Sequence, residues 1–151
     1  MAALHTGWER VTALLSSRAA EAAPLLLARF ALAGVFWRSG RAKIEDGSWF
    51  SISDATYYLF REEYTRVPLP SDLAAIAAAS AEHIFPVLLV VGLGVRLSAL
   101  GLLGMTMVIQ LFVYPEAWWP VHSLWAALAL VLIARGGGVL SLDALFSRRA
   151  R

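Results

Sequence analysis

Three ionisable side chains lie inside stretches of sequence that otherwise carry almost no charge. Arg29 interrupts one apolar stretch, and Glu82 and His83 stand next to each other in another. A charge in the hydrocarbon of a membrane is costly, so residues of this kind are usually paired or functional. A carboxylate beside a cation can serve as a proton station, because the neighbouring charge sets the pKa of the acid. These residues are the first candidates for chemistry.

Arg29 and Glu82 are expected to lie at a similar depth. Arg29 precedes Trp37, at the end of its apolar stretch, by eight residues, and Glu82 follows Asp72 by ten. At about 1.5 Å per helical residue, the two side chains lie roughly 12 Å and 15 Å below the same face. We therefore predict an Arg29–Glu82 pair. Two interpretations stay open: a structural pair that fixes the register of the helices, or a site for a polar head group or a proton.

Further polar side chains extend this candidate site. Gln110 lies near the end of a third apolar stretch, and His122 lies at the start of a fourth. Pro86 lacks the N–H that would bond to the carbonyl of Glu82, which leaves an acceptor beside the carboxylate. His83 points about 100° away from Glu82 around a helix, which argues against a metal site shared by the two.

The composition excludes several cofactors. The chain has no cysteine and only three histidines, so disulfides, thiolate zinc sites and Cys-ligated iron–sulfur clusters do not arise. His83 and His122 differ in expected depth by roughly 13 Å, too far apart to ligate one b-type haem. We expect no haem, iron–sulfur cluster, structural zinc or other metal.

Transmembrane helices are the elements that must position these residues. Apolar residues make up 59% of the 151-residue chain and charged residues 16%, against about 45–50% and 25% in soluble domains. A bilayer core needs about 20 apolar residues per helix, and a helix satisfies its own backbone hydrogen bonds in lipid. The arginines are scattered and the net charge is +2, which argues against a nucleic-acid partner. We predict a single all-α domain over 1–151, a transmembrane four-helix bundle with spans near 22–39, 73–94, 97–114 and 120–135 and an outer loop at 40–71.

Charge and spacing also predict the orientation and the segments at the membrane surface. Seven basic residues fall on the side of the termini and five on the other side, a positive-inside bias that places both termini of a multi-pass inner-membrane protein in the cytoplasm. Three short amphipathic helices are expected in the interface. Their apolar positions are Leu4, Trp8, Val11 and Leu15; Tyr57, Phe60 and Tyr64; and Leu142, Leu145 and Phe146. The second helix is a candidate lid or docking surface for a partner.

The pattern resembles the DoxX family of small four-helix bacterial membrane proteins. The matching pieces, within about residues 22–145, are Arg29, 36–43, Glu82, 92–96 and 136–143. The family takes its name from a membrane subunit linked to thiosulfate:quinone oxidoreductase. The resemblance therefore implies a quinone-associated redox subunit. Segments 60–64 and 110–115 are similar to DoxX proteins found beside metal-dependent enzymes that modify small secreted peptides, which implies a role in metal stress.

Two functions follow from these observations. In the first, the chain is part of a quinone-dependent oxidoreductase; Glu82 exchanges protons, Arg29 stabilises an anionic head group, and a membrane or periplasmic partner supplies the electrons. Further contacts to the quinone are expected from Gln110, His122, His83, Trp37, Trp119 and Lys43. In the second, a non-enzymatic anchor, assembly or metal-stress accessory protein docks its partner through residues 40–70. A homo-oligomer is compatible with both.

Overall fold

The computed structural model describes residues 7–9, 12–14, 17 and 19–149, and the regular secondary structure of this part is helical apart from one isolated bridge between Ile44 and Ile52. In chain order the helices are α2 (Ala22–Arg41), α3 (Asp54–Glu62), α4 (Ser71–Val91), α5 (Val95–Phe112), a 3₁₀ turn (Pro115–Ala117), a π-helical turn (Trp118–His122), α6 (Ser123–Arg135) and α7 (Leu142–Arg149). The four longest helices coincide with the predicted apolar stretches to within a few residues.

Among the described residues, three helical segments are long and apolar enough to cross a membrane: Ser71–Val91, Val95–Phe112 and Pro115–Arg135. The third joins the two short turns to α6. α2 is similar in length but carries three arginines, and it packs against α4 and α6. The predicted all-α membrane fold is therefore confirmed.

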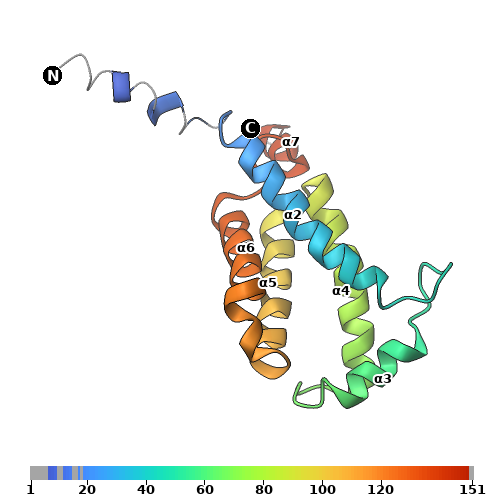
Figure 1. The fold of residues 1–151 in the computed structure, drawn as a ribbon. Helices are drawn as coiled ribbons and strands as arrows, with labels where there is room; N and C mark the ends of the chain where they lie inside the picture. The colour runs from blue at the N-terminus through green and yellow to red at the C-terminus, as the bar shows by residue number, and fades with distance from the viewer. Residues whose placement is uncertain (1–6, 10–11, 15–16, 18, 150–151) are drawn as a thin grey trace.

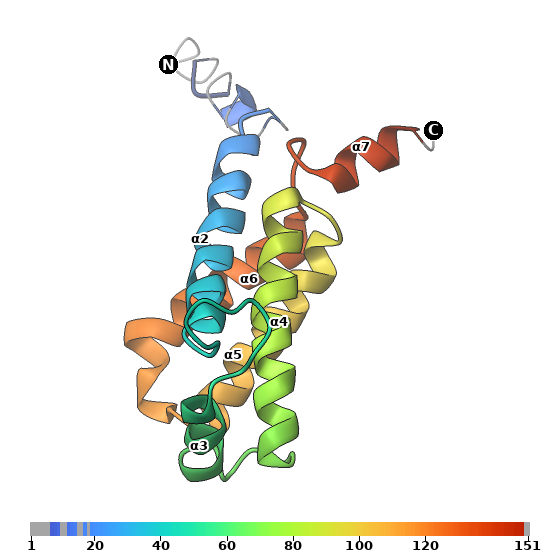
Figure 2. The ribbon, with the colours of Figure 1, turned by 90° about the vertical axis from the view of Figure 1, so that its right-hand side faces the viewer.

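The core lies between α2, α4, α5 and α6, which run side by side in both views of the ribbon (Figures 1 and 2). Leucines on all four helices and Phe36 on α2 are completely enclosed. The outer faces carry exposed apolar side chains such as Leu97, Leu111 and Leu124. This distribution suits a bundle surrounded by hydrocarbon, because lipid tails are as apolar as leucine and no hydrophobic force drives such side chains into the core.

The two ends of the bundle are built differently: α3 lies at one end, and α7 and the start of α2 lie at the other (Figure 1). α3 begins at Ser53, whose hydroxyl accepts a hydrogen bond from the Thr56 N–H at 3.2 Å, a standard N-cap. The guanidinium of Arg61 lies 2.9 Å from the carboxylate of Asp72, which joins α3 to the first turn of α4.

Two of the three predicted amphipathic helices are observed, as α3 and α7. Tyr57, Phe60 and Tyr64 of α3 do not form an open surface, because Phe60 is buried against α4 and the two tyrosines pack around it. The apolar face of this short helix is buried because α4 packs against it. Of the apolar positions of the helix predicted over residues 4–15, Leu4, Val11 and Leu15 lie outside the described residues.

Candidate functional site

Glu82 forms its ion pair with Lys43. The Lys43 ammonium lies 2.7 Å from Glu82 Oε2 and 3.0 Å from Oε1. The Ser39 hydroxyl donates to Glu82 Oε1 at 3.2 Å and accepts a hydrogen bond from Lys43 Nζ at 3.0 Å. The Glu82 side chain is 2% exposed and that of Lys43 12%. A buried carboxylate is thus matched by one cation and one hydroxyl, which is the arrangement that a charge inside a protein requires.

The local sequence of α2 explains this cluster. Ser39 and Lys43 are four residues apart, so both face the same neighbour at the end of the helix. Between them, Gly40 touches α4: a Cβ atom at this position would lie 2.9 Å from His83 Cε1 and 3.0 Å from Glu82 Cβ. Without a side chain, the end of α2 can lie close enough to α4 for Ser39 and Lys43 to reach the carboxylate. The spacing of Ser39 and Lys43 is the signal that could have identified this site from the sequence.

The start of α3 holds Lys43 in place. Its backbone carbonyl accepts two hydrogen bonds, from the Ser53 N–H and from the Thr56 hydroxyl, each 3.0 Å long. Lys43 lies just beyond the last turn of α2, so the helix itself does not fix its backbone, and these two hydrogen bonds do. The ammonium therefore approaches Glu82 from a fixed backbone position.

The predicted Arg29–Glu82 pair is wrong. Arg29 is 1% exposed, and its guanidinium donates to four backbone carbonyls. These carbonyls belong to Leu89 (2.7 Å) and Val90 (2.6 Å) in the last turn of α4, and to Gly137 (3.2 Å) and Leu140 (2.7 Å) in the loop before α7. The last carbonyls of a helix have no partner within the helix and carry partial negative charge. Arg29 therefore caps α4 and ties the loop after α6 to it.

The predicted pairing fails because the end of α2 and the start of α4 do not lie at the same level. Gly40, in the last turn of α2, lies against Glu82 and His83 of α4. α4 therefore extends roughly 15 Å beyond the end of α2, into the region covered by α3 (Figure 1). Arg29 is correspondingly displaced to the other end of α4, where its Nη2 atom lies 2.8 Å from the position of a Cβ on Gly92.

Gln110 and His122 come together as a separate polar contact. His122 Nδ1 lies 2.8 Å from Gln110 Oε1, and Gln110 Nε2 donates to the carbonyl of Pro115 at 2.7 Å. These bonds connect the end of α5 to the start of the next apolar segment. Trp119, a predicted wall of the quinone site, is exposed.

His83 and Trp37 form another separate contact. Their rings meet edge to face with centroids 5.1 Å apart, and His83 Nδ1 lies 2.7 Å from the carbonyl of Ala79. His83 thus points away from the Lys43–Glu82 pair, as expected from its angle on the helix. Both residues help to pack α2 against α4.

A cavity of about 240 Å³ lies between α3, α4 and α5, with Lys43 and Glu82 in its wall. The rest of the lining is almost entirely apolar. It consists of Phe60, Tyr64, Val67, Leu69, Ala74, Ala77, Ala78, Ala81, Met105, Val108 and Ile109. Four of these residues are alanines of α4, whose short side chains leave the space open. The sequence does not predict the cavity or the place of Tyr64 in its wall, because both depend on how α3 folds back over α4.

Tyr64 lines the cavity on the α3 side, and Tyr114 packs against Tyr64. Tyr64 stacks on Phe60 with ring centroids 4.3 Å apart, and its ring meets the edge of Tyr114 at 6.4 Å. The Tyr114 hydroxyl donates to Glu63 Oε2 at 2.7 Å, which links the end of α3 to the end of α5. Burial raises the pKa of Tyr64, with a further contribution from the negative charges of Glu82 and Glu63. The hydrogen bond to Glu63, followed by burial, raises the pKa of Tyr114 to about 12.

We expect Tyr114 to ionise later than an ordinary tyrosine, whose pKa is about 10. Ionisation would place a phenolate against the Glu63 carboxylate, so the folded protein retains this proton up to a pH of about 12. Because the pKa is higher in the folded state, the associated stability is present below pH 10 and is lost as the pH rises towards 12. A titration of tyrosinate absorbance in detergent measures this. Glu63→Gln should shift the latest transition to lower pH, and an unchanged curve would contradict the assignment.

The fold and the site together define a class: a small polytopic helical membrane protein with a buried Lys–Glu pair beside an apolar cavity. The family model DoxX matches residues 24–115, a range that includes Arg29, Lys43 and Glu82. A Haemophilus influenzae protein described as uncharacterized is 32% identical over 140 residues, which cover 82% of this chain and 83% of that protein. No solved structure matches. The chain belongs to the DoxX family, which confirms the resemblance noted in its sequence.

Proposed function

We propose that the protein is a redox-associated membrane subunit that binds a quinone head group in the cavity beside Lys43 and Glu82. The observation that carries the proposal is the cavity itself, which has one buried ion pair in an otherwise apolar wall. Sites for small amphipathic molecules have this composition: apolar surface for most of the ligand and a few polar groups that orient it. The DoxX family is in some cases linked to quinone-related oxidoreductases.

The residues around the cavity fit a quinone. Lys43 and Tyr64 carry N–H and O–H groups of the kind that bind a quinone carbonyl, while Phe60, Met105 and Val108 supply apolar contacts for the ring and its tail. When bound, a quinone supplies two-electron, two-proton redox chemistry. The electrons would come from a partner protein, because the sequence contains no recognisable motif for a redox cofactor of its own.

In this proposal Lys43 takes the role that sequence analysis gave to Arg29. While Glu82 is ionised, its charge is balanced by the Lys43 ammonium at 2.7 Å. When Glu82 holds a proton, the ammonium loses its counter-ion and can stabilise negative charge on a ligand oxygen instead. The pair thus couples the position of a proton to the charge available to the ligand. Ser39 supports both states, because its hydroxyl can donate or accept.

The test is a titration of the purified protein with a soluble quinone analogue, followed by quenching of tryptophan fluorescence. We expect saturable binding that is about ten-fold weaker or more in Lys43→Met, because a hydrogen bond to a charged group contributes about 1.5–3 kcal/mol. Glu82→Gln, whose amide stands in for the protonated acid, leaves the Lys43 ammonium free for the ligand and should keep saturable binding. Glu62→Gln, which removes an exposed carboxylate of α3, is the matched control and should bind like the wild type. Wild-type affinity in folded Lys43→Met would contradict the proposal.

A second candidate function is supported by exposed aromatic side chains in the loop between α2 and α4. Phe50 is 93% exposed, and Trp49 and Tyr58 are also open. Aromatic residues are enriched in the cores of protein interfaces, so this loop could anchor a partner in a non-enzymatic, assembly or metal-stress role. If the termini are cytoplasmic, the loop and the cavity face the periplasmic side of the inner membrane. A folded wild-type protein that binds no quinone analogue would favour this function.

A further inference from the structure

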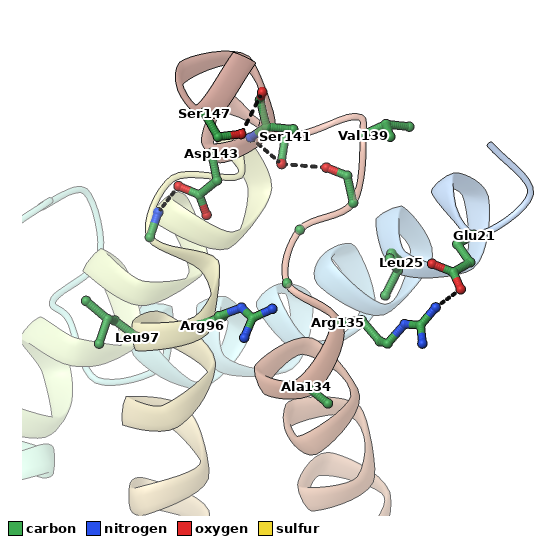
Figure 3. A pocket seen from close by; sticks show the side chains of 15 residues that line it. Glu21, Leu25, Arg96, Leu97, Ala134, Arg135, Val139, Ser141, Asp143 and Ser147 are labelled. Atoms are coloured by element: carbon green, nitrogen blue, oxygen red, sulfur yellow. Dashed lines mark hydrogen bonds and ion pairs between the residues drawn. The ribbon is translucent and has the colours of Figure 1, made fainter. Parts of the chain in front are cut away.

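An open cleft of about 1020 Å³ lies at the end of the bundle opposite α3, between the ends of α2, α5, α6 and α7 (Figure 3). Its lining shares no residue with the cavity beside Lys43 and Glu82. One wall is the glycine-rich loop 136–138, and the others carry both charged and apolar side chains. The charged residues of the lining are Glu21, Arg96, Arg135 and Asp143, and the larger apolar residues are Leu25, Leu97 and Val139.

Arg96 is the one charged side chain of this cleft that has neither an ionic nor a hydrogen-bonded partner among the described residues. Arg135 is paired with Glu21, as Figure 3 shows. The Asp143 carboxylate accepts two backbone N–H groups at the start of α5, at 2.8 and 3.0 Å, and it also interacts electrostatically with Arg29 beneath the loop. The lining thus holds two arginines and two carboxylates; both carboxylates already have partners, and the guanidinium of Arg96 is the one left unpaired.

The guanidinium of Arg96 is presented to the cleft by the backbone around it. It extends from the first turn of α5 towards the loop that follows α6 (Figure 3). Its Nε atom lies 3.4 Å from the position of a Cβ on Gly136, a van der Waals distance, so the guanidinium lies against this loop. Arg29 holds the same loop through the carbonyls of Gly137 and Leu140. The cleft is therefore formed in advance of any ligand.

The cleft lies where the apolar segments end, and this position favours an amphipathic ligand. α4 ends at Val91, α5 begins at Val95 and α6 ends at Arg135, so all three apolar segments reach the membrane surface at this edge. Leu97 follows Arg96 directly and is exposed, which places an apolar wall beside the charged one. A ligand that satisfies both walls has an anionic group attached to hydrocarbon.

We propose that this cleft binds the phosphodiester of an anionic phospholipid, with the Arg96 guanidinium on the phosphate oxygens and an acyl chain along Leu97. The planar guanidinium matches the oxygens of a phosphate in a two-point contact, which an ammonium cannot reproduce. A zwitterionic lipid is disfavoured, because its ammonium group would find both carboxylates of the cleft, Glu21 and Asp143, already engaged. The one unpaired guanidinium of the cleft matches the single negative charge of one phosphodiester.

The proposal is tested on the full-length protein in a mild non-ionic detergent, by following thermal unfolding during titration with short-chain phosphatidylglycerol. Phosphatidylcholine with the same chains and inorganic phosphate are titrated in parallel. We expect a saturable rise in the unfolding temperature with phosphatidylglycerol alone. Arg96→Gln should weaken this binding about ten-fold or more. Arg38→Gln, which removes an exposed arginine near the other end of α2, should bind like the wild type.

The remaining outcomes overturn the proposal in distinguishable ways. Equal stabilisation by phosphatidylcholine would mean that the phosphate charge is not recognised. Saturation by inorganic phosphate alone would assign the cleft to a soluble anion. If Arg96→Gln does not fold, Arg96→Lys decides, because it keeps the charge and loses the two-point contact. It should bind phosphatidylglycerol several-fold more weakly, and wild-type affinity in that variant would contradict the role of the guanidinium.

Discussion

Replacing Arg29 with glutamine is expected to lower the free energy of unfolding by about 3–5 kcal/mol, because several backbone carbonyls lose a hydrogen bond to a charged donor, each worth about 1.5–3 kcal/mol. The guanidinium satisfies four carbonyls from two segments, and the shorter amide cannot reach them all. A buried carbonyl left without a hydrogen bond lowers the stability of the folded state by about 1–3 kcal/mol. Denaturant titration in detergent, followed by circular dichroism, measures the loss.

Two further variants isolate the role of the guanidinium. Arg38→Gln removes an exposed charge from the same helix and should change the stability by about 0.5 kcal/mol or less. Arg29→Lys keeps the charge but places all three donors on one nitrogen, so it should fall between the wild type and Arg29→Gln. A loss below about 1 kcal/mol in Arg29→Gln would show that α4 and the loop after α6 do not depend on this cap.

The second large effect is expected from the Lys43–Glu82 pair, measured as a double-mutant cycle. Lys43→Met leaves a buried carboxylate without its cation, and Glu82→Gln leaves the ammonium without its counter-ion; each should cost about 3–5 kcal/mol. The double variant Lys43→Met/Glu82→Gln should lose less than the sum of the two, with a coupling energy of about 0.5–3 kcal/mol. Unfolding of all four proteins under the same detergent conditions provides the cycle.

This cycle also separates structure from function. The double variant should regain stability relative to the additive expectation, but it should still fail to bind the quinone analogue, since the Lys43 ammonium is gone. A coupling energy near zero would mean that the two side chains do not interact in solution, although they lie 2.7 Å apart in the structure. Recovery of quinone-analogue binding together with stability would assign the pair a purely structural role.

The helices could be predicted from the sequence because their signals are local. α2 covers Ala22–Arg41 where residues 22–39 were expected, and α5 covers Val95–Phe112 where 97–114 were expected. Hydropathy over about 20 residues reports directly on what a bilayer requires. The short helices α3 and α7 were also predicted, because their apolar residues recur with the helical period.

The partner of Glu82 could not be predicted by the same means. Counting residues from each helix end gives a depth only if the helices start at one plane, and α4 starts well beyond the end of α2. That offset is set by α3 and by the contact of Gly40 with Glu82 and His83, neither of which is a local signal. The cavity has the same origin, since it exists because α3 folds back over the alanines of α4.

The cap formed by Arg29 has a consequence for the order of assembly during biosynthesis. Its partners lie 60 and 61 residues later in α4, and 108 and 111 residues later in the loop before α7. At about 5–20 residues per second, the ribosome reaches the last of them roughly 5–20 s after it has made Arg29. During that time the first long helix carries a guanidinium that the hydrocarbon disfavours. The hydrogen bonds of Arg29 in α2 are thus complete only when the loop before α7 has been made, and stable insertion of α2 is coupled to completion of the chain.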